Sequence, residues 1–220
     1  MPAPPTTRSP CSFLTIPREL RDIVYAQVLT LPSPLYLYQE PHSPVALFAP
    51  DKPKNQFSLL FTNRQICRKA AKMLCSTNEF FLLGTAETQH DLLEHLLNGI
   101  GVTNASFISC LCISFLFVHI EEEGQMPRRT VKDDSMRTIQ LIRENCTKLS
   151  VLEMDIDSKS SYLFKQSTTV VTEALSVINT PLKDIQSLIQ IKARVVVREG
   201  GPTAETRRWM HEPGWEVTDD

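Results

Sequence analysis

The chain lacks the long apolar segments by which membrane and secreted proteins are recognised. No stretch reaches the roughly 20 consecutive apolar residues that a membrane-spanning helix requires. The opening residues, MPAPPTTRSPCSF, hold a single arginine and no apolar run of signal-peptide length. We therefore expect an intracellular protein, cytoplasmic or nuclear, without a membrane partner.

The chain also lacks an excess of charge of either sign. Its 23 Lys and Arg residues nearly balance 25 Asp and Glu residues, which leaves a formal net charge of -2. Such a chain has no overall basic field to attract nucleic-acid phosphates, so nucleic acid is not an expected partner. Four cations cluster on one face of a predicted helix, and the simplest interpretation is a solvated surface. They are Arg64, Arg68, Lys69 and Lys72.

No C-x-x-C pair is present, although the chain contains six cysteines. This spacing is the usual one in zinc and redox sites, so neither site is expected. Without other signs of secretion, the thiols are expected to be reduced. Cys110 and Cys112 stand two residues apart in an apolar run, which places both on one face of a strand. Packing is the expected role of these residues, with no metal and no cofactor.

Local catalytic motifs are missing as well. The sequence contains no G-x-S-x-G, no Walker glycine loop and no G-x-G-x-x-G. Of the five histidines, His90 and His95 are five residues apart, and on a helix they would point about 140° away from each other. We expect a protein that is not an enzyme. A hydrolase whose cysteine and histidine meet only in the folded chain is a remote alternative.

Two amphipathic helices are the clearest features that the sequence does contain. The first follows Pro17, a residue suited to the opening of a helix, and carries one apolar face. That face consists of Leu20, Ile23, Val24 and Val28. The second follows a predicted capping box, Thr62-x-x-Gln65, and has its own apolar stripe. That stripe consists of Ile66, Ala70, Met73 and Leu74. The two helices need each other, or a partner, to cover these faces.

The same segments resemble a known family. The run Ile16-Pro17-x-Glu19-Leu20, followed by Val24, Tyr25 and Val28, looks like the first helix of an F-box. Two further runs extend the likeness, Leu60-x-x-Asn63-Arg64-Gln65-Ile66 and Leu74-x-Ser76-x-Asn78-x-Phe80. Together they are similar to the large F-box-like family of filamentous fungi over roughly the first 85 residues. Lys69 and Cys75 depart from that family, which usually has Glu and Tyr there.

The resemblance implies a non-enzymatic interaction protein, a substrate receptor of a cullin-RING ubiquitin ligase. Its partners would be a Skp-type adaptor and a target protein that the sequence does not identify. By the resemblance, the adaptor contacts fall on Ile16, Pro17, Leu20, Val24 and Val28. The alternative is a stand-alone interaction or structural domain, in which these five residues form an internal core between the helices and an inserted hairpin.

Composition divides the chain into four parts. Residues 1–11 are a Pro/Thr/Ser tail expected to be disordered, and residues 12–83 form the F-box-like module. Within it, runs 35–38 and 45–48 predict an inserted hairpin, and NEFFLLG a strand beside it. Residues 84–198 form an α/β region, and residues 199–220 a polar tail. Trp209 and Trp215 in that tail either fold back onto the domain, which is the commoner case, or form a contact surface.

The α/β region alternates helices at 85–98, 133–146 and 170–178 with β runs at 108–120, 149–156 and 182–197. This spacing is typical of right-handed βαβ units. The segment EEEGQMPRRTVKDD is interpreted as a solvated loop, and Asp133 or Asp134 as the cap of the next helix. The inward residues predicted for that helix are Met136, Ile139, Ile142 and Cys146.

The run Leu149-x-x-Leu152-x-Met154-x-Ile156 resembles one leucine-rich repeat. The predicted fold class is therefore α+β or α/β. It consists of F-box-like helices with an inserted β-hairpin, followed by βαβ units that resemble an irregular leucine-rich-repeat-type open sheet.

Overall fold

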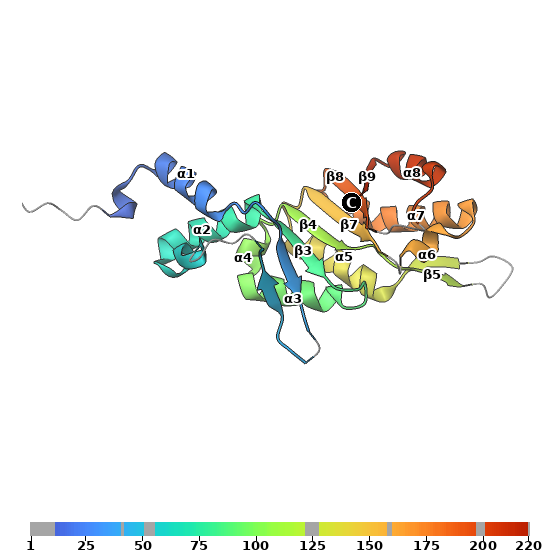
Figure 1. Ribbon diagram of the computed structural model, residues 1–220, viewed down its shortest axis with the longest axis horizontal. Helices are drawn as coiled ribbons and strands as arrows, with labels where there is room; N and C mark the ends of the chain where they lie inside the picture. The colour runs from blue at the N-terminus through green and yellow to red at the C-terminus, as the bar shows by residue number, and fades with distance from the viewer. Residues whose placement is uncertain are drawn as a thin grey trace, which may run out of the picture.

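The computed structural model describes residues 12–40, 42–50, 56–121, 128–157, 160–196 and 201–219. The molecule is elongated, with α1 and α2 at one end, a twisted sheet in the middle and α8 at the other end (Figure 1). Its helices are η1 Phe13–Thr15, α1 Arg18–Leu29, η2 Gln56–Phe61, α2 Arg64–Thr77, α3 Gln89–Ile100, α4 Val102–Ala105, α5 Asp133–Asn145, α6 Ser161–Phe164, α7 Thr168–Lys183 and α8 Ala204–His211. No helix of the described residues is long and apolar enough to cross a membrane.

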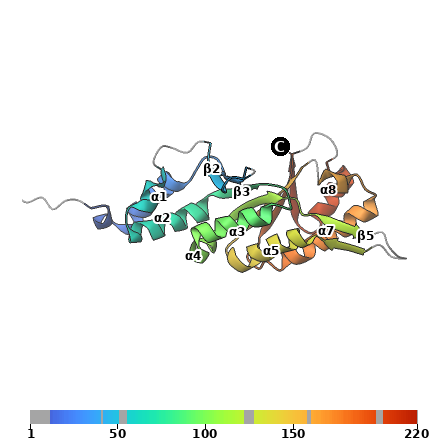
Figure 2. The ribbon, with the colours of Figure 1, turned by 90° about the horizontal axis from the view of Figure 1, so that it is seen from below.

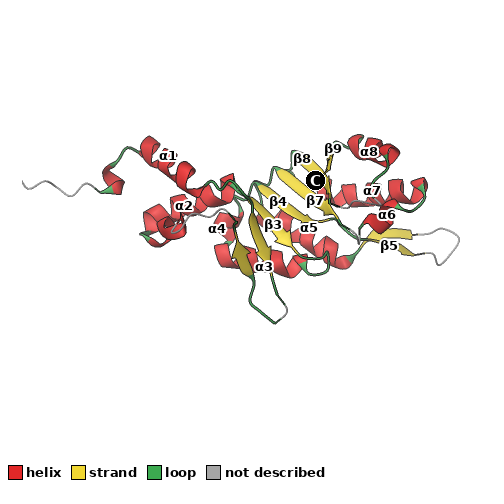
Figure 3. Cartoon of the chain, in the orientation of Figure 1, coloured by secondary structure: helices red, strands yellow, loops and turns green. Residues whose placement is uncertain are grey.

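A seven-stranded sheet forms the centre of the fold, in the order β2-β1-β3-β4-β7-β8-β9 (Figure 3). Its strands are β1 Leu35–Tyr38, β2 Ala46–Phe48, β3 Glu79–Leu83, β4 Cys110–Ser114, β7 Val151–Ile156, β8 Gln190–Val195 and β9 Trp215–Asp219. Strand β2 is antiparallel to its neighbour β1, and the other neighbouring pairs are parallel. The mixed α/β class and the open, largely parallel sheet are confirmed.

Helices α3, α5 and α7 lie side by side against one face of this sheet (Figure 2). The face is apolar because alternate residues of each strand point toward these helices. One row of it crosses the sheet through Phe80, Leu111, Leu152, Ile191 and Trp215. Four of these five residues are buried in the larger of two hydrophobic cores, which we call the main core. Ile191 is partly buried and packs against it. We call the opposite side of the sheet the open sheet face.

Helices α1 and α2 share a second, smaller core. It consists of Tyr25 and Leu29 from α1 with Ile66 and Ala70 from α2. The cap of α2 differs from the predicted capping box. Asn63, and not Thr62, is the N-cap, because the Asn63 side-chain oxygen accepts hydrogen bonds from the backbone N–H groups of the first helical turn.

The predicted hairpin is confirmed. Strands β1 and β2 pair antiparallel, and β3 lies parallel to β1 on its other side. These segments of the N-terminal module are thus the first strands of the same sheet that the α/β region continues. The module and the later strands share one main core.

The apolar run at 108–120 was predicted as one strand, and this is wrong. It divides into β4 and β5 (Val118–Glu121), which belong to different sheets. Strand β5 pairs antiparallel with β6 (Arg128–Val131), so part of the segment interpreted as a solvated loop is a strand. An ion pair between Arg129 of β6 and Glu173 of α7 anchors this ribbon. Residues 122–127 of that segment lie outside the described residues.

Helix α5 differs from its prediction at its start. Lys132 is the N-cap, whereas Asp133 and Asp134 lie in the first turn, where carboxylates interact favourably with the helix dipole. Met136 was predicted to face inward but is 40% exposed. Ser135 takes the inward position in the first turn, and Met136 lies about 100° around the helix from it. The rest of the inward stripe is as predicted, with Ile139, Ile142 and Cys146 buried.

The predicted β run at 182–197 is also shorter than expected. Helix α7 continues to Lys183 and includes Pro181. Leu182 is buried four residues after Ile178, so it extends the helical stripe instead of beginning a strand. The strand β8 begins at Gln190. The prediction confused a helix end rich in apolar residues with the strand that follows.

The segment at 199–220 was predicted as a polar tail, but residues 204–219 form α8 and the edge strand β9. Thr203 caps α8 through its side-chain oxygen. Trp215 is 2% exposed and lies in the main core, and Trp209 is half-buried. The expectation that the tryptophans fold back is confirmed.

Candidate functional site

The first candidate surface is the outer side of α1, at the protruding end of the molecule (Figure 1). The helix buries Tyr25 and Leu29 against α2. On its other side, Leu20 is 52% and Ile23 is 53% exposed, and Pro17 at the N-cap is exposed as well. We call these three residues the α1 stripe. An apolar surface of this kind, directed away from the protein's own core, is typical of a site that a partner covers.

The five predicted adaptor residues are divided between this surface and the interior. Pro17 and Leu20 are exposed, whereas Ile16, Val24 and Val28 are half-buried. Val28 packs against the small core of α1 and α2. Ile23 belonged to the predicted apolar face but not to the five predicted contacts, and its helical position beside Leu20 would have identified it.

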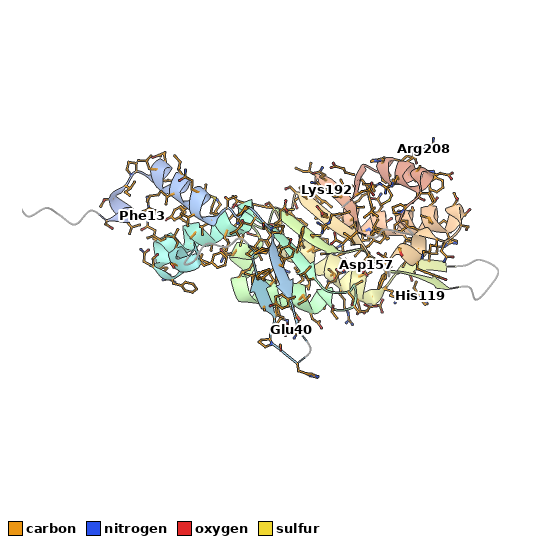
Figure 4. All side chains as sticks on the ribbon, viewed as in Figure 1. Phe13, Glu40, His119, Asp157, Lys192 and Arg208 are labelled. Carbon is orange, nitrogen blue, oxygen red and sulfur yellow. The ribbon has the colours of Figure 1, made fainter. Side chains whose placement is uncertain are left out.

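The segment before α1 fixes the direction of the helix. Ser12 caps the short helix η1 with its side-chain oxygen. The Phe13 ring then packs edge-on against Tyr25, with 5.6 Å between the ring centroids. Figure 4 places Phe13 at this outer end of the molecule. Burial raises the pKa of the Tyr25 phenol. These contacts occupy the inner side of α1 and leave the α1 stripe outside.

The second candidate surface is the open sheet face. Its central residues follow the pairing of the strands, with Glu153 opposite Lys192 and Asp155 opposite Arg194. Cys112 on β4 lies opposite Glu153. This surface could have been inferred from the sequence, because charges alternate with apolar residues in VLEMDI and QIKARV. The pairing of the two strands was not predicted.

Arg194 organises the centre of this face. Its guanidinium donates two hydrogen bonds to Asp155, from Nε to Oδ1 at 2.9 Å and from Nη2 to Oδ2 at 2.8 Å. It also pairs with Glu153 at 3.2 Å and lies 4.8 Å from the centroid of the Phe81 ring on β3. The Cys112 thiol donates to Asp155 Oδ1 at 3.4 Å. The Arg194 side chain therefore connects strands from β8 to β3.

Cys112, Glu153 and Asp155 bring three possible metal-ligand atoms within 4.8 Å of one another. Their environment does not fit a metal ion. The Arg194 cation already pairs with both carboxylates, and a divalent ion there would be repelled by it. Burial, and then the charge of Asp155, raises the pKa of the Cys112 thiol, so the thiolate that binds metal is disfavoured.

A further group, His90, Asp91 and Glu94, lies on α3. The three are neighbours on one stretch of helix, and both carboxylates are exposed. The Nδ1 atom of His90 is buried without a hydrogen-bond partner, but the ring as a whole is only half-buried and the two carboxylates are solvated.

Three further thiols, of the buried Cys75 and Cys146 and the half-buried Cys110, are poor nucleophiles because they are held in the protonated form. Burial raises the pKa of Cys75 to about 11 and those of Cys110 and Cys146 to about 12. A nucleophilic cysteine needs the opposite shift, because the thiolate is the reactive form. The five cysteines in the described part of the chain are free, in agreement with the expected reduced state.

Comparison with known proteins gives no assignment. A scan against protein-family models and searches of curated proteins and of solved structures found no match to this chain.

Proposed function

We propose that this protein is a non-enzymatic interaction protein that binds a Skp-type adaptor through the α1 stripe and a target protein through the rest of the fold. It would then serve as a substrate receptor of a cullin-RING ubiquitin ligase. The observation that carries the proposal is the exposure of Leu20 and Ile23 beside Pro17, on the side of α1 that faces away from α2. These residues lie within the segment that resembles an F-box.

The arrangement of the two surfaces supports this role. The α1 stripe lies at one end of the molecule, and the open sheet face lies in the middle (Figure 1). An adaptor on α1 would leave the open sheet face available. Such a protein needs no catalytic residues of its own, because it acts by holding a target at high effective concentration near another enzyme.

A stand-alone interaction domain is the second candidate. Ile16, Val24 and Val28 are half-buried, and Val28 contributes to the small core, so part of the F-box-like pattern already has an internal role. On this alternative, α1 and α2 only stabilise each other and no adaptor binds.

Copurification with a recombinant Skp-type adaptor separates the two candidates. The test variant is Leu20→Asp with Ile23→Asp, which places charge on the α1 stripe without altering the buried Tyr25 and Leu29. The matched control is Ile189→Asp, because Ile189 is 86% exposed and lies in the turn before β8. Circular dichroism and thermal unfolding check that all three proteins fold.

We expect a 1:1 complex with the wild type and with Ile189→Asp. The double variant should bind at least about 30-fold more weakly, since two central apolar contacts of about 1–2 kcal/mol or more would each become a buried charge. Absence of binding by the folded wild type, or equal binding by the double variant, would reject the adaptor site and favour the stand-alone domain.

A further inference from the structure

A pocket of about 850 Å³ lies between α2 and α4. Helix α2 lines one wall with Arg64, Arg68, Lys69 and Lys72, and the other wall contains Asn104 and Phe107. We call it the α2–α4 pocket. It is separate from the small core, because the cations project from the side of α2 opposite Ile66 and Ala70.

The positive charge of this pocket is not compensated within the described residues. None of the acidic side chains among them lines it. None of the ion pairs between described residues involves its two arginines or two lysines. These cations are gathered at one place in a chain whose formal net charge is -2. A solvated face, the interpretation from sequence, does not explain why they line one wall of a pocket.

The Phe107 ring contacts two ammonium groups at the edge of the pocket, and one of them, that of Lys148, adds a fifth positive charge. The Lys72 ammonium lies 4.9 Å and the Lys148 ammonium 4.5 Å from the centroid of its ring. Cation–π contacts of this kind position ammonium groups without neutralising them. Lys148 comes from the turn before β7, so α2, the turn after α4 and this turn all contribute to one cationic site.

We propose that the α2–α4 pocket binds a phosphorylated side chain in a segment of a partner protein. A phosphate group offers close to two negative charges and three acceptor oxygens, which match several donors in a small space. Arg64 and Arg68 are four residues apart on α2 and so lie on the same side of the helix, where their planar guanidinium groups can engage phosphate oxygens bidentately. Lys69 and Lys72 line the same wall and add two further positive charges.

A phosphopeptide fits these observations better than a nucleic acid. Single-stranded nucleic acids bind along extended basic grooves and stack their bases on aromatic rings. Here Phe107, the one aromatic residue of the described chain that lines the pocket, is occupied by two ammonium groups. Phosphopeptide binding does not depend on adaptor binding, because the α1 stripe and the α2–α4 pocket share no residues.

The test uses a fluorescein-labelled peptide mixture with a central phosphoserine between degenerate flanking residues, and its unphosphorylated serine counterpart. Binding to the full chain is followed by fluorescence anisotropy. The test variants are Arg68→Glu with Lys72→Glu, and the milder Arg68→Gln with Lys72→Gln. The control is Lys165→Glu with Arg208→Glu, which changes the net charge equally to the first; Figure 4 shows Arg208 on α8, at the end of the molecule away from α2.

We expect the phosphoserine mixture to bind the wild type at least about tenfold more tightly than the serine mixture, since charge-assisted hydrogen bonds are lost with the phosphate. Both α2 variants should lose this preference, and the control should keep it. In ¹H–¹⁵N spectra, the phosphoserine mixture should shift the amide signals of residues 64–72 and 103–107.

Three results would overturn the proposal. They are equal binding of both peptide mixtures, retention of the preference by the folded α2 variants, and tighter binding of a single-stranded RNA oligonucleotide than of the phosphoserine mixture. A pull-down of the α2 variants with the adaptor distinguishes failure of the phosphopeptide proposal from failure of the proposed function. The α1 stripe is intact in these variants, so they should still bind the adaptor if the proposed function is right.

Discussion

The Asn78 side chain joins the ends of two helices by bonding to the chain near Leu29. Its amide nitrogen donates to the Leu29 carbonyl at 2.8 Å, and its oxygen accepts from the Leu31 N–H at 2.7 Å. The same nitrogen donates to the Leu74 carbonyl at 2.8 Å. Asn78 is 3% exposed and follows α2 directly. It therefore fixes the C-terminal end of α1, and with it the direction in which the α1 stripe points.

Replacing Asn78 by alanine should destabilise the fold by about 2–4 kcal/mol, because it leaves three buried or partly buried backbone groups without this partner. Urea unfolding measures the change. Asn78→Asp is the informative comparison, since it keeps the acceptor for Leu31 but removes both donors and places a negative charge beside carbonyl oxygens. It should be at least as damaging as alanine. A loss below about 0.5 kcal/mol for both variants would mean that water replaces the amide without cost.

Elements with a strong local pattern were predictable from the sequence. The hairpin at 35–48 and the helical stripe of Ile66 and Ala70 depend on periodicity within one segment, and both were predicted correctly. The end of α7 and the strand β9 were not, because apolar residues at a helix end and a short alternating strand near residue 217 have weak local signals. Neighbouring β8 provides the partner that makes β9 a strand.

The candidate surfaces were also only partly predictable, because they depend on contacts between distant parts of the chain. Pro17 and Leu20 could be named from the F-box-like pattern, but which side of α1 is buried depends on Tyr25 meeting Ile66 across two helices. The cations of α2 were visible in the sequence as a cluster. The pocket was not, because its other wall comes from Asn104 and Phe107, more than 30 residues away along the chain.

Replacing Arg194 by methionine should destabilise the fold by about 2–4 kcal/mol at neutral pH, because it leaves two partly buried carboxylates unpaired. Burial already raises the pKa of Glu153, while Arg194 lowers it. An acid with a raised pKa in the folded state favours folding when protonated, so its contribution is present at low pH and is lost as pH rises through the folded-state pKa. Replacing Arg194 removes the charge that lowers the pKa of Glu153, so the stability of the variant should depend more strongly on pH.

The variant should therefore lose more stability at pH 7 than at pH 4, because burial raises the pKa of Glu153 and favours its protonated form at the lower pH. Urea unfolding at the two pH values measures the difference. A matched variant, Arg194→Met with Glu153→Gln and Asp155→Asn, removes the charges together and should recover much of the loss at pH 7. A pH-independent loss in the single variant would attribute the effect to the contact with Phe81 instead.

The cysteines should differ sharply in their reactivity toward Ellman's reagent at pH 8. In a Cys11→Ser background, the half-buried Cys67 should react first. The buried Cys75, Cys112 and Cys146 should react only as the protein unfolds, because burial both shields them and raises the pKa of each thiol. In urea, all the thiols should react at similar rates. Rapid modification of Cys112 in the folded protein would reveal an activated thiol and would reopen the enzymatic alternative.

These raised pKa values also predict loss of stability in alkali. In the unfolded chain the thiols ionise near the ordinary cysteine pKa of 9.0, whereas in the folded state burial raises the pKa of Cys75 to about 11 and that of Cys146 to about 12. A thiol with a raised folded-state pKa contributes stability below the unfolded pKa, and this contribution is lost as pH rises toward the folded value. The free energy of unfolding should fall above pH 9 by up to about 1.4 kcal/mol per pH unit for each thiol. Cys146→Ala should show a shallower fall, and an equal slope would contradict the assignment.

Trp215 should be essential to the last part of the sheet. Its ring lies in the main core, with 6.2 Å between its centroid and that of Phe115, and its Nε1 donates to Asn179 Oδ1 at 3.2 Å. Trp215→Ala should cost about 3–5 kcal/mol, the usual effect of emptying a buried aromatic site. Trp215→Phe retains a ring but leaves the Asn179 oxygen unpaired, which should cost about 1–3 kcal/mol.

Trp209→Phe is the matched control, because Trp209 is only half-buried beside α7, and it should be nearly neutral. Chemical denaturation ranks the three variants, and hydrogen exchange shows where protection is lost. Because β9 forms the edge of the sheet next to β8, the Trp215 variants should lose protection first at residues 190–195 and 215–219. Uniform loss across the whole sheet would show instead that the C-terminal strand unfolds only together with the rest of the molecule.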